Sequence, residues 1–135
     1  MQEAQAENIQ PKKKILIIED DTMTRMALCR ILDKLNFQTF GACNGYMGLK
    51  LFKQMHPDVI ITDILMPDKE GLSTIAEMIV ADPKAVIIAM SGGGATRNMG
   101  FLEIAKKIGA ARTITKPFTP RQILELMDDI QLARA

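Results

Sequence analysis

Four charged residues at the ends of short, largely apolar runs could do chemistry together: Glu19, Asp20, Asp63 and Lys116. A hydroxyl, that of Ser91, ends another apolar run. Carboxylates without neighbouring His or Cys residues are hard oxygen ligands, and these favour Mg²⁺. A carboxylate can also act as a nucleophile toward a phosphoryl group, with a metal ion, a lysine and a hydroxyl stabilising the transferred oxygens. The residue types therefore indicate Mg²⁺-dependent phosphoryl chemistry.

Asp63 is the best candidate for the nucleophile, because it stands alone at the end of its run. Three carboxylates at one place repel one another, and two like charges about 4 Å apart cost roughly 4 kcal/mol at an effective dielectric of 20. We expect Lys116 and a divalent cation to offset this repulsion. The alternative is that the acids only cap helices and strands, and we favour that role for Asp21, next to an expected helix start.

The elements that must position these residues are apolar runs alternating with longer amphipathic stretches. Strands are expected at residues 14–18, 37–42, 58–62, 85–91 and 111–115, and helices at residues 22–36, 45–55, 71–81, 101–110 and 119–133. This alternation predicts an α/β fold, with a five-stranded parallel sheet and helices on both faces. In the flavodoxin-like strand order 2-1-3-4-5, the candidate residues all lie at the carboxyl edge of the sheet, where ligands bind.

Capping residues and glycines set the expected boundaries of the helices. Thr22, Asn44 and Thr119 are expected N-caps. The helix at residues 101–110 is expected to finish at Gly109. The glycine-containing stretch before that helix, residues 92–100, is expected to be a loop.

Length and composition exclude several classes of protein. The 135 residues favour one domain, and we expect residues 1–12 to be a flexible tail and residues 13–135 the folded domain. A net charge of +1 gives no whole-chain footprint for nucleic acid or a membrane surface. No apolar run approaches the roughly 18 residues of a membrane helix, and the start lacks the apolar region of a secretory signal. The two cysteines show no metal-binding spacing and fit a reducing cytoplasm.

Four segments in the chain, "ILIIEDD", "ITDILMP", "MSGG" and "TKPF", occur in an order and at intervals that resemble response regulator receiver domains of two-component signalling. The resemblance covers about residues 14–133. It implies a stand-alone signalling switch, not an enzyme, that is phosphorylated on Asp63 by a histidine kinase or phosphotransfer protein. With no output domain expected in the chain, the signal would leave by contact with a downstream protein target.

The resemblance also implies a role for each site residue. The Mg²⁺ ion would be held by the acidic pair, the phosphoacceptor and one backbone carbonyl, which are Glu19, Asp20, Asp63 and Leu65. Asp20 would be the more direct ligand of the acidic pair. Ser91 would be the switch hydroxyl, and Lys116 would contact the phosphoryl group. The bond between Lys116 and Pro117 would be cis.

Three features of this sequence depart from the family pattern. Glu19 replaces the commoner first Asp of the acidic pair, and its longer side chain should still reach the metal. Thr113 occupies the position that usually carries an aromatic switch residue. Gly92, Gly93 and Gly94 follow Ser91 and could either bring backbone N–H groups to the phosphate or form a mobile loop. Because Thr113 has no ring to rotate, we expect residues 92–100 to carry the coupling from Ser91.

Three alternatives to a phosphorylated switch differ in the residues that they require. A phosphatase with an Asp nucleophile would place a second carboxylate two residues later, where this chain has Leu65. A flavin-binding module would need a Ser/Thr/Gly-rich phosphate loop after the first strand, where this chain has the acidic "EDDTMTR". A degenerate receiver would act only as a binding module, but this chain keeps Asp63, Lys116 and the acidic pair.

Overall fold

Ten helices and strands alternate along the part of the chain that the computed structural model describes, residues 11–64, 71–92 and 95–134. In chain order they are β1 (Lys14–Ile18), α2 (Thr22–Lys34), β2 (Gln38–Ala42), α3 (Gly45–Met55), β3 (Val59–Asp63), α4 (Gly71–Ala81), β4 (Val86–Ser91), α5 (Ala95–Ile108), β5 (Arg112–Thr115) and α6 (Pro120–Arg134). The expected N-terminal tail lies outside the described residues except for its last two, and so do Leu65 and Gly93.

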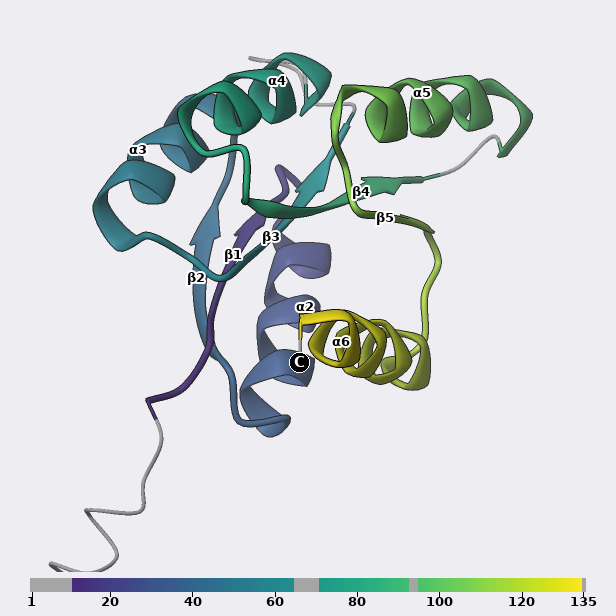
Figure 1. Ribbon diagram of the computed structural model, residues 1–135. Helices are drawn as coiled ribbons and strands as arrows, with labels where there is room; N and C mark the ends of the chain where they lie inside the picture. The colour runs from purple at the N-terminus through teal and green to yellow at the C-terminus, as the bar shows by residue number, and fades with distance from the viewer. Residues whose placement is uncertain (1–10, 65–70, 93–94, 135) are drawn as a thin grey trace, which may run out of the picture.

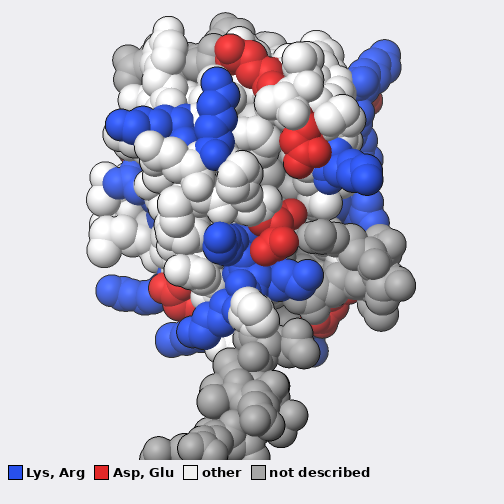
Figure 2. Space-filling view, turned by 60° about the vertical axis from the view of Figure 1, so that its left-hand side comes forward, with Lys and Arg blue, Asp and Glu red and all other residues white. Residues whose placement is uncertain are grey.

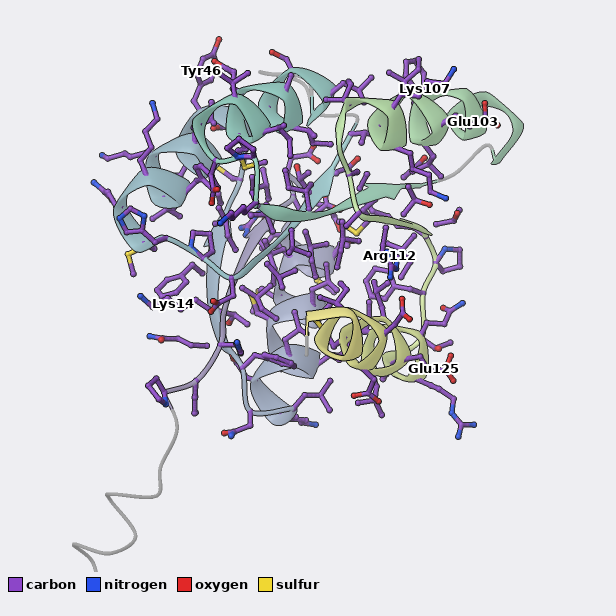
Figure 3. All side chains as sticks on the ribbon, in the orientation of Figure 1. Lys14, Tyr46, Glu103, Lys107, Arg112 and Glu125 are labelled. Carbon is purple, nitrogen blue, oxygen red and sulfur yellow. The ribbon has the colours of Figure 1, made fainter. Side chains whose placement is uncertain are left out.

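The strands form one parallel sheet in the order β2-β1-β3-β4-β5, which confirms the predicted fold class and strand order. Helices α3, α4 and α5 cover one face of the sheet, and α2 and α6 cover the other (Figure 1). Arg112 of β5 lies between the sheet and α6 (Figure 3), where its Nε donates to Asp129 Oδ2 at 2.6 Å. The central position of β3 brings residues of β1 and β4 to both sides of Asp63.

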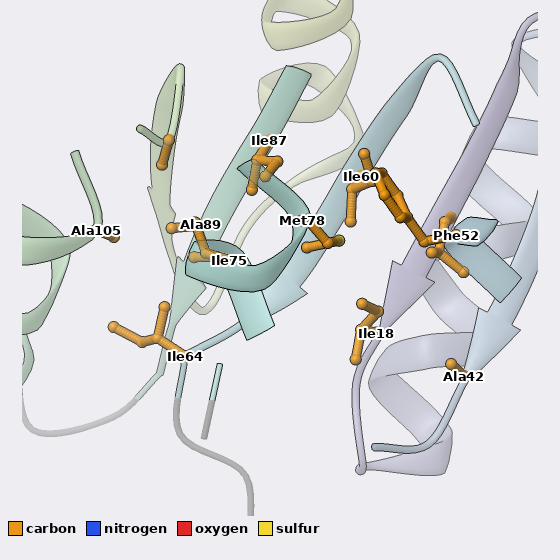
Figure 4. Packing of buried hydrophobic residues seen from close by; sticks show 12 residues of the cluster. Ile18, Ala42, Phe52, Ile60, Ile64, Ile75, Met78, Ile87, Ala89 and Ala105 are labelled. Atoms are coloured by element: carbon orange, nitrogen blue, oxygen red, sulfur yellow. The ribbon is translucent and has the colours of Figure 1, made fainter. Parts of the chain in front are cut away.

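Two hydrophobic cores form because each inner strand is apolar on both faces. Leu16 and Ile18 of β1 belong to the core beneath α3, α4 and α5, part of which Figure 4 shows. Ile15 and Ile17, which alternate with them, belong to the core beneath α2 and α6. Each of these four side chains is at most 1% exposed. Burying such a side chain stabilises the fold by about 1.5–3 kcal/mol. The carboxyl end of β1, which leads into Glu19 and Asp20, is therefore held firmly in place.

Local capping decides where most helices begin. The N-cap of α2 is Asp21, not Thr22 as predicted, because Asp21 keeps an extended backbone and its side chain accepts from the N–H of Thr24 at 2.9 Å. The prediction for Asn44 is confirmed, since Asn44 Oδ1 accepts from the N–H of Met47 at 2.8 Å. At α6, Thr119 exchanges side-chain and backbone hydrogen bonds with Gln122, as in a capping box.

The expected loop at residues 92–100 is wrong over most of its length, because α5 begins at Ala95. The prediction gave too much weight to glycine. Gly100 lies inside the helix with no atom within 4 Å of a built Cβ, so it is tolerated there at a cost of about 1 kcal/mol relative to alanine. The helix ends at Ile108, and Gly109 follows with a φ of 141°, which favours glycine. The coupling that we assigned to this stretch would therefore involve the first turns of α5.

The surface mixes charges of both signs. Figure 2 shows Lys and Arg side chains interspersed with Asp and Glu on one face of the molecule. This agrees with the net charge of +1, which offers no long-range field for a charged polymer. Within residues 11–64, 71–92 and 95–134, no helix combines the length and the hydrophobicity that crossing a membrane would require.

Candidate functional site

The acidic residues meet because β1 and β3 are neighbours in the sheet. Ile18 pairs with Thr62, so the next residues, Glu19 and Asp63, leave the sheet side by side. Carboxylate oxygens of Glu19, Asp20 and Asp63 lie within 4.8 Å of one another. Like charges this close repel, and the cluster therefore needs a compensating cation.

The side chain of Lys116 supplies one cation to this cluster. Its Nζ contacts Glu19 Oε1 and donates to Asp63 Oδ2 at 2.7 Å. Lys116 follows β5, two strands away from β3, and its backbone N–H donates to the carbonyl of Ser91 at 2.7 Å. The backbone is thus fixed at the edge of the sheet, and the long side chain reaches inward to the carboxylates.

Gly92 leaves room for the side chain of Lys116. A Cβ atom built on Gly92 would lie 2.9 Å from Lys116 Cδ, which is closer than side-chain carbons approach one another. The bond between Lys116 and Pro117 is cis, as the family resemblance implies. A side chain at the position after Ser91 would therefore obstruct the Lys116 side chain on its way to Asp63.

Burial and the neighbouring charges alter two pKa values in the cluster. The pKa of Glu19 is raised to about 7, chiefly by burial and also by the charge of Asp63, against the opposing effect of the hydrogen bond from Lys116. Burial lowers the pKa of Lys116, but its hydrogen bonds to Asp63 and Glu19 outweigh that effect and raise it above its ordinary value. Lys116 therefore remains an ammonium group at neutral pH.

Glu19 and Asp20 differ in how freely their side chains can bind a ligand. Glu19 is fully buried, and while one oxygen contacts Lys116, the other accepts from the N–H of Asp21 at 3.3 Å. Asp20 is exposed. Asp21 caps α2, the role that its position suggested. Of the acidic pair, Asp20 thus has the more open carboxylate.

The hydroxyl of Ser91 lies at the end of β4, next to β3. Asp63 pairs with Met90, so Ser91 is one residue beyond that pair. Ser91 is fully buried, and its Oγ is a buried side-chain atom that has no hydrogen-bond partner among the described residues. Leaving a buried hydroxyl unsatisfied costs about 1–3 kcal/mol, so an oxygen bound beside Asp63 would gain a ready donor.

The other predicted site residues lie apart from this cluster or outside the described residues. Thr113 pairs with Ala89 inside the sheet, two residues before the end of β5, and is half-buried. Leu65 and Gly93 fall in segments that the structure does not describe, so their predicted roles at the metal and the phosphoryl group stay predictions.

One residue near the site was missed in the sequence. Arg25 of α2 donates from Nη1 to the backbone carbonyl of Glu19 at 2.7 Å. The side chain of Arg25 passes over Gly41 near the end of β2. A lone arginine on the polar side of an amphipathic helix carries no signal of such a contact.

The donor set fits a Mg²⁺ ion. Three carboxylates offer oxygen atoms within 4.8 Å of one another, and no thiol or imidazole belongs to the group. Mg²⁺ binds through one or two carboxylates while keeping water molecules and phosphate oxygens in its shell. Asp20 and Asp63 could serve in this way, with Glu19 behind them.

Comparison with known proteins identifies the family. The model of the response regulator receiver domain matches residues 15–128. A chemotaxis protein CheY from Thermotoga maritima is 34% identical over 119 residues, which cover 87% of this chain and 97% of that protein. Sporulation initiation phosphotransferase F of Bacillus subtilis is 30% identical over 106 residues, covering 78% of this chain and 83% of that protein.

Solved structures agree with the sequence relatives. A CheY-like receiver domain protein from Methanospirillum hungatei superposes with a TM-score of 0.82 at 26% identity, covering 93% of this chain and 100% of that one. A receiver domain protein from Clostridium thermocellum gives a TM-score of 0.77, also at 26% identity, over 87% of this chain and 92% of that one. The chain therefore belongs to the response regulator receiver domains, which are signalling switches of two-component systems and not enzymes.

Proposed function

We propose that this chain accepts a phosphoryl group on Asp63, in a Mg²⁺-dependent reaction, from a histidine kinase or a phosphotransfer protein. The observation that carries this proposal is the ammonium of Lys116, which touches both Asp63 and Glu19. The proposal is supported by the buried hydroxyl of Ser91 on the neighbouring strand, which has no hydrogen-bond partner within residues 11–64, 71–92 and 95–134. Lys116 contacts the Asp63 carboxylate and Ser91 ends the neighbouring strand, and both carry donors suited to phosphoryl oxygens.

The transfer can be written with this chain's own residues. An oxygen of Asp63 attacks the phosphorus of a phosphohistidine on the partner. The new P–O bond forms as the P–N bond breaks, and the electron pair of that bond remains on the imidazole nitrogen of the partner. Lys116 turns from the Asp63 carboxylate to a phosphoryl oxygen, and Ser91 donates to another. A bound Mg²⁺ ion would supply further positive charge for the transferred oxygens.

The three carboxylates would contribute to Mg²⁺ binding in different ways. Asp20 and Asp63 would bind it, because Asp20 is open to solvent and Asp63 is the reacting group. Glu19 would hold Lys116 and reach the ion through water, because both of its oxygens already have partners in the protein. The carbonyl of Leu65, implied by the family resemblance, would complete the protein ligands.

Phosphorylation would then act as a population shift. When Ser91 turns toward a phosphoryl oxygen, the change would reach the start of α5. The start of α5 lies four residues after Ser91, so the surface of that helix would change and alter contacts with a downstream protein. Thr113 would pass on less of this change than an aromatic ring could.

The proposal is tested by incubating the protein with Mg²⁺ and a small phosphodonor such as phosphoramidate, and measuring intact mass. We expect the wild type to gain one phosphoryl group and Asp63→Asn to gain none. Asp58→Asn, at the other end of the same strand, is the matched control and should be phosphorylated like the wild type. Phosphorylation of Asp63→Asn, or none of the wild type with or without a partner kinase, would refute the proposal.

A further inference from the structure

Arg25 of α2 contacts the backbone of the acidic pair, Glu19 and Asp20. Arg25 lies one turn into α2 and is half-buried. Its Nη1 donates to the carbonyl oxygen of Glu19 at 2.7 Å, and its Nη2 lies 3.5 Å from Thr22 Oγ1. The carbonyl of Glu19 belongs to the peptide bond that leads into Asp20, so this contact acts on the direction in which Asp20 leaves β1.

The backbone of Glu19 is held from two sides. Its N–H donates to the carbonyl of Ala42 at 2.9 Å, which continues the pairing of β1 with β2 by one residue. Its carbonyl oxygen receives Arg25. Beyond the last strand pair no regular ladder fixes the next peptide plane, and a charged donor to that carbonyl is roughly twice as strong as a neutral one.

The path of Arg25 depends on a glycine in the edge strand. A Cβ atom built on Gly41 would lie 3.2 Å from Arg25 Cδ and 3.5 Å from Cγ. The aliphatic part of the arginine therefore packs closely over Gly41, and a side chain there would require Arg25 to shift by a few tenths of an ångström. Gly41 is exposed, so burial of its own surface does not explain a glycine here.

From these contacts we infer that Arg25, seated on Gly41, is a positioning residue that sets the peptide between Glu19 and Asp20 and so aims the Asp20 carboxylate for a divalent cation. This inference rests on the proposed function, because it takes the acidic pair to be the Mg²⁺ site. Groups that orient metal ligands typically change metal affinity 10–100-fold when they are removed.

Charge and positioning predict opposite results for Arg25→Ala. Removing a positive charge near a cation site would by itself tighten Mg²⁺ binding. Loss of the hydrogen bond would instead release the Asp20 peptide and weaken binding. The sign of the change in Mg²⁺ affinity therefore separates the two effects.

The experiment measures Mg²⁺ dissociation constants of the full chain by isothermal titration calorimetry. We expect Arg25→Ala to weaken binding about 10-fold, Arg25→Lys to restore part of the loss, and the exposed Arg30→Ala on the same helix to leave the affinity unchanged. Unchanged or tighter binding by Arg25→Ala would overturn the inference. Wild-type affinity in Asp20→Asn would instead overturn the proposed metal site itself.

Two further measurements test the positioning role: a double-mutant cycle between Gly41 and Arg25, and amide hydrogen exchange in the metal-free protein. Gly41→Ala keeps Arg25 but crowds its path, and should weaken Mg²⁺ binding less than Arg25→Ala. In an Arg25→Ala background the same Gly41 substitution should have no further effect, because the two residues act as a pair. In the metal-free protein, amide hydrogen exchange at Asp20 should be faster in Arg25→Ala than in Arg30→Ala. Additive effects of the two substitutions, or equal exchange rates, would contradict the inference.

Discussion

Asp58 precedes the first residue of β3, and Asp63 is its last residue. Asp58 accepts from the backbone N–H of Lys14 at 2.8 Å, and its own N–H donates to the carbonyl of Lys14 at 2.8 Å. Asp63 is instead contacted by the side-chain amine of Lys116. Asp58 connects the starts of β1 and β3, whereas Asp63 belongs to a cluster of side chains that come from several strands.

The difference lies in what kind of partner each aspartate has. A backbone N–H is fixed by the fold and cannot be exchanged for a ligand. The amine of Lys14, labelled in Figure 3, donates to the carbonyl of Met55 at 3.2 Å. The amine of Lys116 sits on a flexible side chain and can move from a carboxylate to a phosphoryl oxygen. A reactive carboxylate thus needs a partner that can be exchanged, and Lys116 is such a partner for Asp63.

The largest effect is expected from packing at the carboxyl end. A Cβ atom on Gly71, the first residue of α4, would lie 2.1 Å from the carbonyl oxygen of Asp63 and 2.4 Å from Ile64 Cα. These are backbone atoms and cannot swing aside, so Gly71→Ala should lower the free energy of unfolding by at least about 3 kcal/mol. Urea denaturation monitored by circular dichroism measures this loss.

Gly100→Ala is the matched control, because a Cβ there meets no atom within 4 Å. That substitution should raise stability by up to about 1 kcal/mol, since alanine favours a helix interior. Equal effects of the two substitutions would show that the end of β3 is not enclosed as tightly as the geometry indicates.

Magnesium should act on one end of β3 only. A ligand at 100 times its dissociation constant stabilises the folded state by about 2.7 kcal/mol. We expect this gain in the wild type and in Asp58→Ala, but not in Asp20→Asn. The measurement compares urea denaturation with saturating Mg²⁺ and with a chelator. A full Mg²⁺ effect in Asp20→Asn would place the ion away from the acidic pair.

Without metal, removing a carboxylate should change the free energy of unfolding in opposite directions at the two ends of β3. Asp58→Ala leaves the N–H of Lys14 without its acceptor and should destabilise the protein by about 1–2 kcal/mol. Asp20→Asn removes one of three like charges and should stabilise it by about 1 kcal/mol, a value reduced by the exposure of Asp20. Denaturation in the presence of a chelator checks both. Destabilisation by Asp20→Asn would mean that repulsion within the cluster is already relieved.

The sequence predicts this contrast only in part. Apolar runs long enough to be buried on both faces, alternating with amphipathic helices, determine a parallel sheet, and a parallel sheet brings the ends of all its strands to one edge. That rule is enough to place Glu19, Asp20, Asp63 and Lys116 at the same edge. It also places Asp58 at the far edge, away from them.

What the sequence could not provide are contacts that depend on side-chain reach. Arg25 follows the periodicity of an ordinary polar helix position, and its contact with Glu19 requires the path over Gly41 that only the folded sheet creates. The start of α5 was missed because the glycines at residues 92–94 and 100 were weighed too heavily against helix formation. Asp21 and Thr22 both suit an N-cap, and the choice between them depends on which residue keeps an extended backbone, here Asp21.

The smallest effect on stability should come from Gly92→Ala, which tests the role of Lys116 as the exchangeable partner of Asp63. The built Cβ would lie 2.9 Å from Lys116 Cδ, and this flexible side chain can shift, so we expect a change below about 1 kcal/mol in the free energy of unfolding. The shift would nonetheless move the amine away from Asp63, and a misplacement of this kind should slow phosphorylation by phosphoramidate about 10-fold. In a Lys116→Ala background the Gly92 substitution should have no additional effect, because the side chain that it displaces is gone. If Gly92→Ala slowed the reaction equally in both backgrounds, the glycine would act on the phosphoryl group directly and not through the lysine.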